Sequence, residues 1–467
     1  MTARIADSLI TGIDWLITVD DGRRIIRDGA IAIKDGKFAA VGKSADIEAQ
    51  WQSGDVTPGR DRVVTPGFID AHLHSSFQLS RGLADEVSAK SFLFEHMYPY
   101  EGVLERGDVY ASSSLAALEL LRHGVTCYVE HGNYHPMATA EAVDATGMRA
   151  VVCRSTFDKT KSVMGLLPKA MIEHTDQAVD ATEDLLKTYG NKPGTRIRAG
   201  VSFRGLNNST DELITRLTEL SRKYGTTIQT HASFSEQTRA SSLETYGMTE
   251  IARLEKLGAL GRNFIAVHSG WLEPEDMEIM AQRRPNIVAA PSSSLHNGYG
   301  NTTMGKLPEL AEAGINVAIG SDHATSGIVD MAQEMLLLAG GYKETRIDPQ
   351  IMPPEQVLEM ATINGARAAG QAGEIGSIEV GKEADLVMFD TRRPEWQPLF
   401  NPVSNLVYSA TGASVTTVYV AGIKVVDHAR LTQVDEDEIY DEVARVMDRL
   451  RDKLDIKKFI RLQWPVS

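Results

Sequence analysis

The fold of this chain is decided by the stretch Val64-Thr65-Pro66-Gly67-Phe68-Ile69-Asp70-Ala71-His72-Leu73-His74. A short apolar strand ends there in two histidines that stand two positions apart. Because side chains alternate along a strand, His72 and His74 lie on one face at its C-terminal end and offer two nitrogen ligands to one metal ion. The alternative is that they only close the strand, since a chain with 12 histidines in 467 residues can hold such a pair by chance.

Seven more apolar runs of strand length follow, and helical patterns separate most of them. The runs are residues 124–129, 148–155, 197–203, 227–231, 264–268, 286–290 and 316–322, with helical patterns at 111–123, 176–189 and 210–224. Alternating strands and helices are typical of parallel βα units. Eight strands predict a closed barrel, so we expect an α/β protein whose (β/α)8 TIM barrel spans residues 66–372.

Short β patterns occupy both ends of the chain. Strands are predicted at residues 9–11, 15–19 and 30–34, with turn signals at 20–22, 28–29 and 35–36. Residues 384–389 and 416–426 show the same pattern near the other end. Because chain termini often lie close together, we expect residues 1–65 and 373–434 to form one small composite β-sandwich. Residues 435–467 are expected to be a charged helix and tail.

The composition excludes several kinds of partner. Asp and Glu outnumber Lys and Arg by 63 to 48, and this net charge of −15 argues against nucleic acid, which needs a basic face. No apolar run is long enough for a membrane helix, and the first residues lack a signal-peptide pattern. Cys127 and Cys153 lie in apolar runs and are expected to be buried thiols. We predict a cytoplasmic homo-oligomer with a small-molecule substrate and no membrane partner.

Three further metal-competent or proton-competent side chains end predicted barrel strands. They are His231, His268 and Asp322. Active sites of such barrels lie at the C-terminal ends of the strands, so these side chains are expected to meet the first histidine pair. Three imidazoles and one carboxylate suit Zn²⁺ or a similar divalent ion and leave a position for water. The ion would give hydroxide at neutral pH, a carboxylate would accept the proton, and a further histidine would polarise a substrate carbonyl.

On these residues the chain resembles the amidohydrolase superfamily over essentially its whole length. The likeness is to the mononuclear-metal branch that contains cytosine deaminase-like and triazine chlorohydrolase-like enzymes. It implies one divalent ion per subunit, zinc before iron, cobalt or manganese, held by His72, His74, His231 and Asp322. It also implies that His268 contacts substrate or water and that Asp322 shuttles protons. The fourth strand, 200–204, offers no lysine to bridge a second metal.

The chain departs from this branch where a glutamate usually follows the fifth-strand histidine by three residues. Phe234 stands there, and Glu236 follows two residues later. Protonation of a ring nitrogen needs an acid, so an apolar ring disfavours a purine and favours an apolar substrate with a carbonyl group. We therefore predict a hydrolase that cleaves the C–N or C–S bond of a urea, carbamate or thiocarbamate in xenobiotic degradation, near the phenylurea and molinate hydrolases.

Two alternatives stay open. One is an aminohydrolase, deaminase or chlorohydrolase that acts on a heteroaromatic ring such as a triazine, pyrimidine or purine. The other is a barrel that has lost catalysis and only binds. In each case several polar and aromatic side chains near the strand ends are predicted to contact the ligand, namely His268, Phe234, Phe77, His131, Asn297 and His323.

Overall fold

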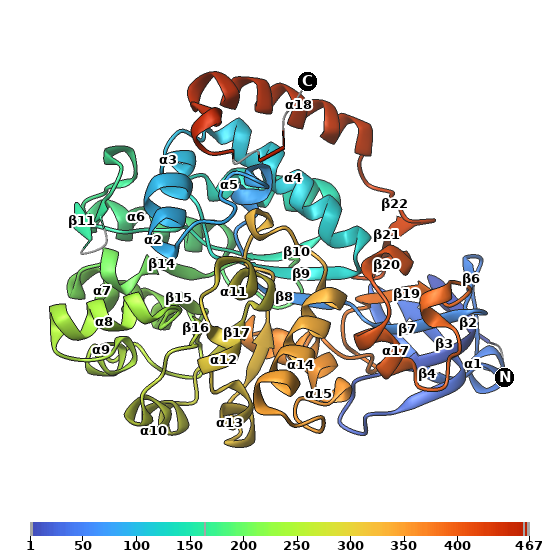
Figure 1. Cartoon of the computed structure of the whole chain (residues 1–467). Coiled ribbons are helices and arrows are strands. Elements are labelled where there is room, and N and C mark those ends of the chain that lie inside the picture. Colours follow the sequence, from blue (N-terminus) through green and yellow to red (C-terminus); the bar gives the residue numbers. More distant parts are fainter. Residues whose placement is uncertain (1–2, 163–164, 461–462, 465–467) are drawn as a thin grey trace.

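The computed structural model describes residues 3–162, 165–460 and 463–464. Its centre is a set of parallel strands at all eight predicted places, and the fourth place holds two of them, β13 and β14 (Figure 1). They are β8 (Phe68–Leu73), β9 (Val125–Glu130), β10 (Arg149–Val152), β13 (Ile197–Ala199), β14 (Val201–Gly205), β15 (Ile228–Ala232), β16 (Phe264–His268), β17 (Asn286–Ala289) and β18 (Val317–Ile319). The predicted α/β class and parallel strands are thus confirmed.

The parallel strands pair in two arcs, β8-β9-β10-β13 and β14-β15-β16-β17-β18. The arcs divide the fourth predicted strand at Gly200, where an added Cβ would stand 2.9 Å from Cys153 Sγ. A parallel bridge between Leu73 and Asp322 connects β8 to the residues after β18. This bridge brings the opening histidine pair next to the last predicted ligand.

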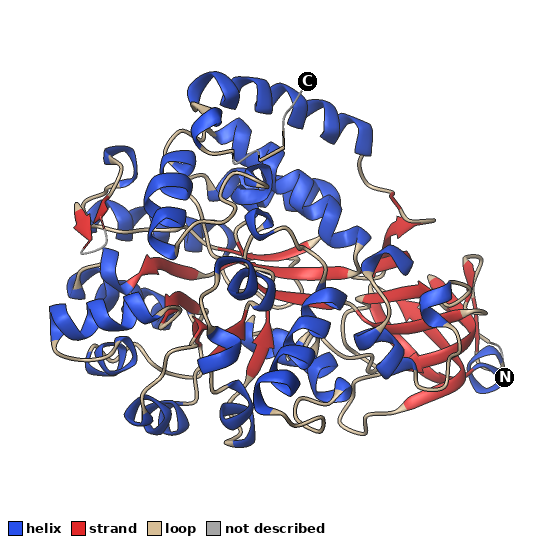
Figure 2. Ribbon diagram, in the orientation of Figure 1, coloured by secondary structure: helices blue, strands red, loops and turns tan. Residues whose placement is uncertain are grey.

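Helices surround these strands (Figure 2). They are α2 (Ala89–Ser91), α3 (Tyr98–Glu101), α4 (Arg106–Arg122), α5 (Pro136–Thr146), α6 (Thr175–Tyr189), α7 (Asp211–Tyr224), α8 (Glu236–Tyr246), α9 (Glu250–Lys256), α10 (Pro274–Arg283), α11 (Pro291–Asn297), α12 (Asn301–Met304), α13 (Leu307–Glu312), α14 (Met331–Arg346), α15 (Pro354–Met360) and α16 (Ile363–Ala368). The predicted helices at 111–123, 176–189 and 210–224 correspond to α4, α6 and α7. Helix α4 begins earlier than predicted because Glu105 and Asp108 form a capping box.

Strands from both ends of the chain pair into one sheet, at the right of Figure 1. Its order is β22-β21-β20-β19-β7-β2-β3-β4, with β6 beside β2. The bounds are β2 (Ser8–Ile17), β3 (Ile25–Lys34), β4 (Lys37–Lys43), β6 (Val56–Pro58), β7 (Arg62–Pro66), β19 (Leu386–Asp390), β20 (Val415–Val420), β21 (Ile423–Asp427) and β22 (Arg430–Leu431). Because β19 lies antiparallel to β7, the C-terminal strands continue the N-terminal part of the sheet.

Two details of the N-terminal prediction are wrong. The run 9–11 and residues 15–17 of the second run form one strand, β2, because Gly12 adopts a φ of 65° and the ladder with β3 resumes beyond it. The predicted turn at 28–29 lies inside β3, where Gly29 pairs with Ile13 and Arg27 with Trp15. The hairpin predicted at 416–426 is present, with β20 and β21 joined at Ala421 and Gly422.

The remaining elements complete the chain. They are β1 (Arg4–Ile5), α1 (Ser44–Glu48), β5 (Trp51–Gln52), β11 (Lys161–Ser162), β12 (Gly165–Leu166), α17 (Pro402–Tyr408) and α18 (Glu436–Lys453). Helix α18 lies in the segment predicted to be a terminal helix, of which 461–462 and 465–467 fall outside the described residues. Cys127 and Cys153 are buried free thiols, as predicted. No helix among the described residues is long and apolar enough to cross a membrane. The domain boundaries stay a prediction.

Candidate metal centre and active-site cavity

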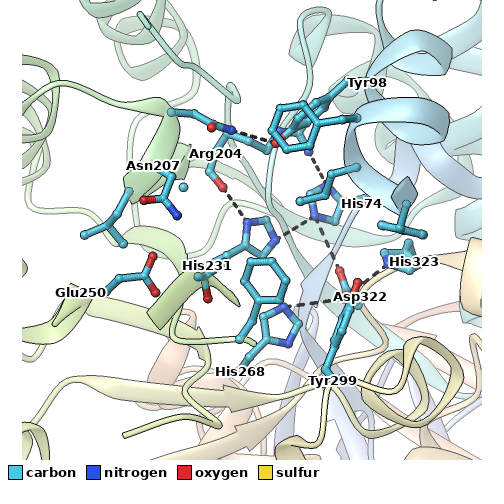
Figure 3. A pocket seen from close by; sticks show the side chains of 18 of the residues that line it. His74, Tyr98, Arg204, Asn207, His231, Glu250, His268, Tyr299, Asp322 and His323 are labelled. Atoms are coloured by element: carbon cyan, nitrogen blue, oxygen red, sulfur yellow. Dashed lines mark hydrogen bonds and ion pairs between the residues drawn. The ribbon is translucent and has the colours of Figure 1, made fainter. Parts of the chain in front are cut away.

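Six metal-competent side chains meet at the C-terminal ends of the barrel strands. Figure 3 labels four of them, His74, His231, His268 and Asp322. The six fall into two overlapping groups of four, and within each group the ligand atoms all lie within 4.8 Å of one another. One group is His72, His74, His131 and His231, and the other is His72, His231, His268 and Asp322. We call all six the ligand cluster. It contains every side chain that the sequence places in the metal site.

Hydrogen bonds fix which ring nitrogen of His72 faces the cluster. Gln229 donates its Nε2 to the Glu130 carbonyl oxygen at 2.7 Å, so its Oε1 is the acceptor for His72 Nδ1 at 3.3 Å. A neutral His72 therefore carries its proton on Nδ1 and turns the Nε2 lone pair toward Asp322 Oδ1, 3.2 Å away. A lone pair and a carboxylate oxygen at this distance need a proton or a cation between them.

His231 shows the same arrangement on the other side of the cluster. Its Nδ1 donates to the carbonyl oxygen of Arg204 at 2.7 Å, which leaves Nε2 free 3.2 Å from His74 Nε2. Two ligands held about 2.0 Å from one tetrahedral ion lie about 3.3 Å apart. The ring orientations and the spacings therefore fit a single bound divalent ion.

Burial sets the protonation of the cluster. It lowers the pKa of His74, His131 and His231 well below the usual value, and that of His268 to about 4. These imidazoles are thus neutral near pH 7, as metal ligands must be. Burial alone would raise the pKa of Asp322, but the neighbouring histidines outweigh it and hold that pKa well below its usual range. Neutral nitrogens of these four histidines therefore lie beside one anionic oxygen, that of Asp322.

The backbone at the strand ends is held in an uncommon conformation. Ser233, His268 and Asp322 have φ values of 50°, 73° and 66°, in the left-handed region that few non-glycine residues adopt. Asp322 is fixed by two backbone bonds, from its amide to the His72 carbonyl at 2.9 Å and from the His74 amide to its own carbonyl at 2.6 Å. Such strain is typical of functional sites, where it aims side chains at a ligand.

Two supporting residues bring the end of β18 against β8. The buried carboxyl group of Asp70 accepts hydrogen bonds from the Ser321 amide at 3.0 Å and from the Ser321 hydroxyl. At Gly320, an added Cβ would stand only 2.7 Å from the backbone N and O of His72. Glycine therefore permits the close approach that places Asp322 beside the histidine pair.

A cavity of about 680 Å³, its open mouth included, lies above the ligand cluster. We call it the strand-end cavity. Beside the cluster residues, its lining is mostly aromatic and apolar: Phe77, Phe92, Leu93, Phe94, Tyr98, Leu206, Phe234 and Tyr299. Its one cation among the described lining residues outside the histidines is Arg204, whose guanidinium forms a buried ion pair with Glu101. The cavity thus suits a largely uncharged ligand.

The predicted ligand-contacting residues divide between the cavity and its surroundings. Phe77, Phe234, His268 and His323 line it, whereas His131 and Asn297 are not among the described lining residues. The ring of His131 lies 4.1 Å from that of His231, within the ligand cluster. Asn297 instead donates its Nδ2 to the Ser293 carbonyl within α11, at 3.0 Å.

Sequence reasoning missed Glu250, which also lines the cavity. This residue begins helix α9 and its side chain points toward Asn207 and His231 (Figure 3). No signal in the sequence could have found it, because it stands 19 positions after His231 at the start of an ordinary surface helix.

Comparisons with known proteins agree with this geometry. The model of a family described as "Amidohydrolase family" matches residues 63–425. A "5-methylthioadenosine/S-adenosylhomocysteine deaminase" of Syntrophobacter fumaroxidans is 33% identical over 94% of this chain and 98% of its own. A "5'-deoxyadenosine deaminase" of Methanosarcina acetivorans is 30% identical over 93% and 96%. The crystal structure of a Xanthomonas campestris adenosine deaminase with bound zinc is 28% identical, with a TM-score of 0.90 over 97% of this chain and all of the other.

These findings overturn the prediction of a urea, carbamate or thiocarbamate hydrolase in xenobiotic degradation. Relatives that match almost the whole chain are named deaminases, so the alternative reaction at a heteroaromatic ring is the better supported one. The physical reason for the error is local. Phe234 stands where the branch has its glutamate, yet the carboxyl group of Glu250 lines the same cavity from α9.

Proposed function

This chain belongs to the amidohydrolase family and is a metal-dependent hydrolase of carbon–nitrogen bonds, and we propose that it deaminates an adenine nucleoside whose 5′ position carries a small uncharged group. The observation that carries the proposal is the strand-end cavity, which joins the ligand cluster to an aromatic wall and whose described lining holds no Lys or Arg besides the paired Arg204. The relatives named as deaminases of 5′-modified adenosines support the substrate class.

We infer that four residues hold the metal, namely His72, His74, His231 and Asp322. Zinc is the proposed ion, because three imidazoles and a carboxylate suit it and the Xanthomonas structure contains it. When bound, the ion supplies Lewis acidity that lowers the pKa of a coordinated water toward neutrality. His131 lies close enough to the three histidines of this set to add a fourth nitrogen donor.

The chain's own groups then move the protons. The ionised carboxylate of Asp322 accepts a proton from the attacking water and passes it to the amino group that leaves as ammonia. The neutral imidazole of His268, whose Nε2 lies 3.8 Å from Asp322 Oδ2, donates a hydrogen bond to the oxygen that adds to the ring. His268 Nδ1 is buried with no hydrogen-bond partner among the described residues, so the imidazole has a donor or acceptor left for a ligand.

The wall of the cavity selects the 5′ group. Phe92 and Leu93 belong to the π-helical turn Phe92–Met97, and Phe77 closes the apolar side beside them. An apolar 5′-deoxy or 5′-methylthio group gains about 25 cal/mol per Å² of surface that it buries there. A charged 5′ group would lose its hydration without an ionic partner.

The test is a release assay for ammonia. The purified zinc-loaded protein is incubated with 5′-deoxyadenosine, 5′-methylthioadenosine, adenosine and guanine, and with a phenylurea and a thiocarbamate. We expect ammonia and the corresponding inosine from the first two substrates, and no turnover of the urea or thiocarbamate. Failure of all adenine nucleosides, in protein shown to contain one metal ion per chain, contradicts the proposed function.

A further inference from the structure

Only two carboxyl groups are found among the described residues that line the strand-end cavity, those of Asp322 and Glu250. Asp322 belongs to the ligand cluster, whereas Glu250 belongs to neither group of metal-competent residues. The side chain of Glu250 is nevertheless buried, with the residue 3% exposed. A buried carboxyl group that lines a cavity and lies outside the metal-competent groups is a candidate for a role in catalysis.

The position of Glu250 is fixed from the strand that carries a cluster histidine. Its Oε2 accepts a hydrogen bond from the backbone amide of Ser233, two residues after His231. Ser233 has a left-handed φ of 50°, and this turn sends the next side chain, Phe234, toward His268 and Tyr299, with ring centroids 5.8 and 5.3 Å away. Phe234 therefore occupies the aromatic side, and the acid enters from α9.

Hydrolysis of an aminopurine needs an acid in this place. When water adds to the amino-bearing carbon C6, the electron pair of the C6–N1 bond moves onto N1, which must gain a proton. Asp322 cannot supply it, because its carboxylate is ionised at the start and the proton that it then takes from the water goes to the leaving amino group. The remaining carboxyl group of the cavity is that of Glu250.

Glu250 is suited to carry a proton near neutral pH. Burial raises its pKa to about 7, and the Ser233 amide and Arg253 oppose this rise, whereas Asp276 adds to it. A group with this pKa is half protonated at pH 7 and can both give a proton to a ring nitrogen and regain one from solvent.

Resting on the proposed function, we propose that Glu250 is the general acid that protonates N1 of the substrate. The C6–O bond forms as N1 takes the proton from the Glu250 carboxyl group, and this proton stays in the product. The C6–N bond then breaks as ammonia leaves with the proton from Asp322. The last proton of the added water returns to solvent when the C=O bond forms, and Glu250 is reprotonated from solvent.

The first test is Glu250→Gln, which keeps an oxygen for the Ser233 amide but removes the acidic proton. We expect kcat/KM for 5′-methylthioadenosine to fall about 10²- to 10⁴-fold, through kcat, with metal content and thermal midpoint unchanged. In the wild type, activity should fall as the pH rises through about 7, and this basic limb of the pH–activity profile should be absent in Glu250→Gln. The matched control is Glu236→Gln, since the Glu236 side chain is 52% exposed and is the first acid after His231. We expect it to retain wild-type activity and pH profile.

The second test moves the acid within the cavity. The double variant Phe234→Glu/Glu250→Gln places a carboxyl group at position 234, which directly follows Ser233 and also lines the cavity. Part of the lost kcat should therefore recover. If Glu250 only held the Ser233 amide in place, a carboxyl group at position 234 would not restore kcat. The role of Glu250 is overturned if Glu250→Gln keeps more than a tenth of wild-type kcat/KM, or if its activity falls only together with metal content and folding and the double variant recovers none. If the wild type releases no ammonia from any adenine nucleoside, the proposed function is wrong and this role is overturned with it.

Discussion

Asp322 is held at once by backbone hydrogen bonds and by side-chain contacts. Its left-handed backbone is bonded to both histidines of the opening pair, and its carboxylate is held ionised inside the barrel. The oxygen Oδ1 faces His72 Nε2 at 3.2 Å, while Oδ2 lies 3.5 Å from His323 Nε2. A single side chain therefore touches the metal position, the cavity and the strand that begins the barrel.

Asp322→Asn is expected to abolish turnover without unfolding the protein. The amide keeps the shape of the side chain but cannot accept a proton from water, so kcat should fall by about 10²- to 10⁴-fold. Ammonia release, metal content and thermal unfolding are measured together. Asp184→Asn is the control, because the Asp184 side chain is 75% exposed on α6. Full activity in Asp322→Asn would contradict its proton-transfer role.

The cavity wall predicts a preference between two 5′ groups. S-adenosylhomocysteine carries an ammonium and a carboxylate that would meet Phe92, Leu93 and Phe94, and Arg204 is already paired with Glu101. An unpaired charge in such a site costs several kcal/mol, so kcat/KM for 5′-methylthioadenosine should exceed that for S-adenosylhomocysteine at least about 100-fold. Competition of the two substrates in one reaction measures the ratio. Equal consumption would show that the charged group finds a partner elsewhere.

At the residue scale the sequence predicted which metal-competent side chains come together better than it predicted which residues line the cavity. Alternation along a strand places His72 and His74 on one face. The common C-terminal edge of the barrel strands then brings His231 and Asp322 to this pair. Glu250 and Asn297 depend instead on how short helices turn after the strands, which no local pattern encodes. For this reason the prediction from Phe234 was wrong, since the acid that lines the cavity comes from Glu250 on helix α9 and not from position 234.

The element that matters most for the site is the end of β18. It meets β8 through the Leu73–Asp322 bridge, the hydrogen bonds of Ser321 to Asp70 and the close approach of Gly320 to His72. The sequence predicts both strands, since each is a buried apolar run. It does not predict how the fourth strand divides at Gly200 or that β2 continues past Gly12, because both features depend on neighbouring strands and not on local pattern.

Gly320→Ala is predicted to damage the metal site through the backbone. The new methyl group would meet the His72 backbone at 2.7 Å, so β18 must shift outward and carry Asp322 away from His72. We expect at least a tenfold loss of zinc affinity and about 1–3 kcal/mol of stability. Chelator competition and denaturant unfolding measure the two effects. Gly340→Ala, in α14, is the control, because an added Cβ there has no atom within 4 Å. Unchanged zinc affinity in Gly320→Ala would contradict this account of the strand contact.

On the scale of the whole molecule, the barrel and the terminal sheet share buried structure. The sheet mixes β2, β3 and β7 from one end of the chain with β19 and β20 from the other, so neither end can complete it alone. Its core contains Ile10 and Val64 together with Leu386 and Tyr419. The β patterns at the two ends predicted this association in outline, whereas the pairing of β19 with β7 depends on how the barrel returns the chain to its start.

A buried ion pair connects these two parts. Arg149, at the start of β10 and fully buried, donates Nε and Nη2 to the two oxygens of Asp385, both at 3.0 Å. Asp385 precedes β19 and also accepts the amide of Ala421 at 2.7 Å. Arg149 lies at the end of the barrel opposite to the ligand cluster, because β10 begins at this residue and the cluster lies where the strands end.

Arg149→Met should therefore destabilise the molecule without altering its chemistry. It leaves the Asp385 carboxylate buried without its cation, which costs about 3–5 kcal/mol of the free energy of unfolding. Arg149→Met/Asp385→Leu removes both charges and should recover part of this loss, so a double-mutant cycle in denaturant gives a coupling energy between the barrel and the sheet. The exposed pair Arg451–Asp448 is the control, and Arg451→Met should change stability by less than about 0.5 kcal/mol. A loss below about 1 kcal/mol in Arg149→Met, or a fall in kcat of its folded fraction, would show that the pair does not hold the two parts together as this geometry requires.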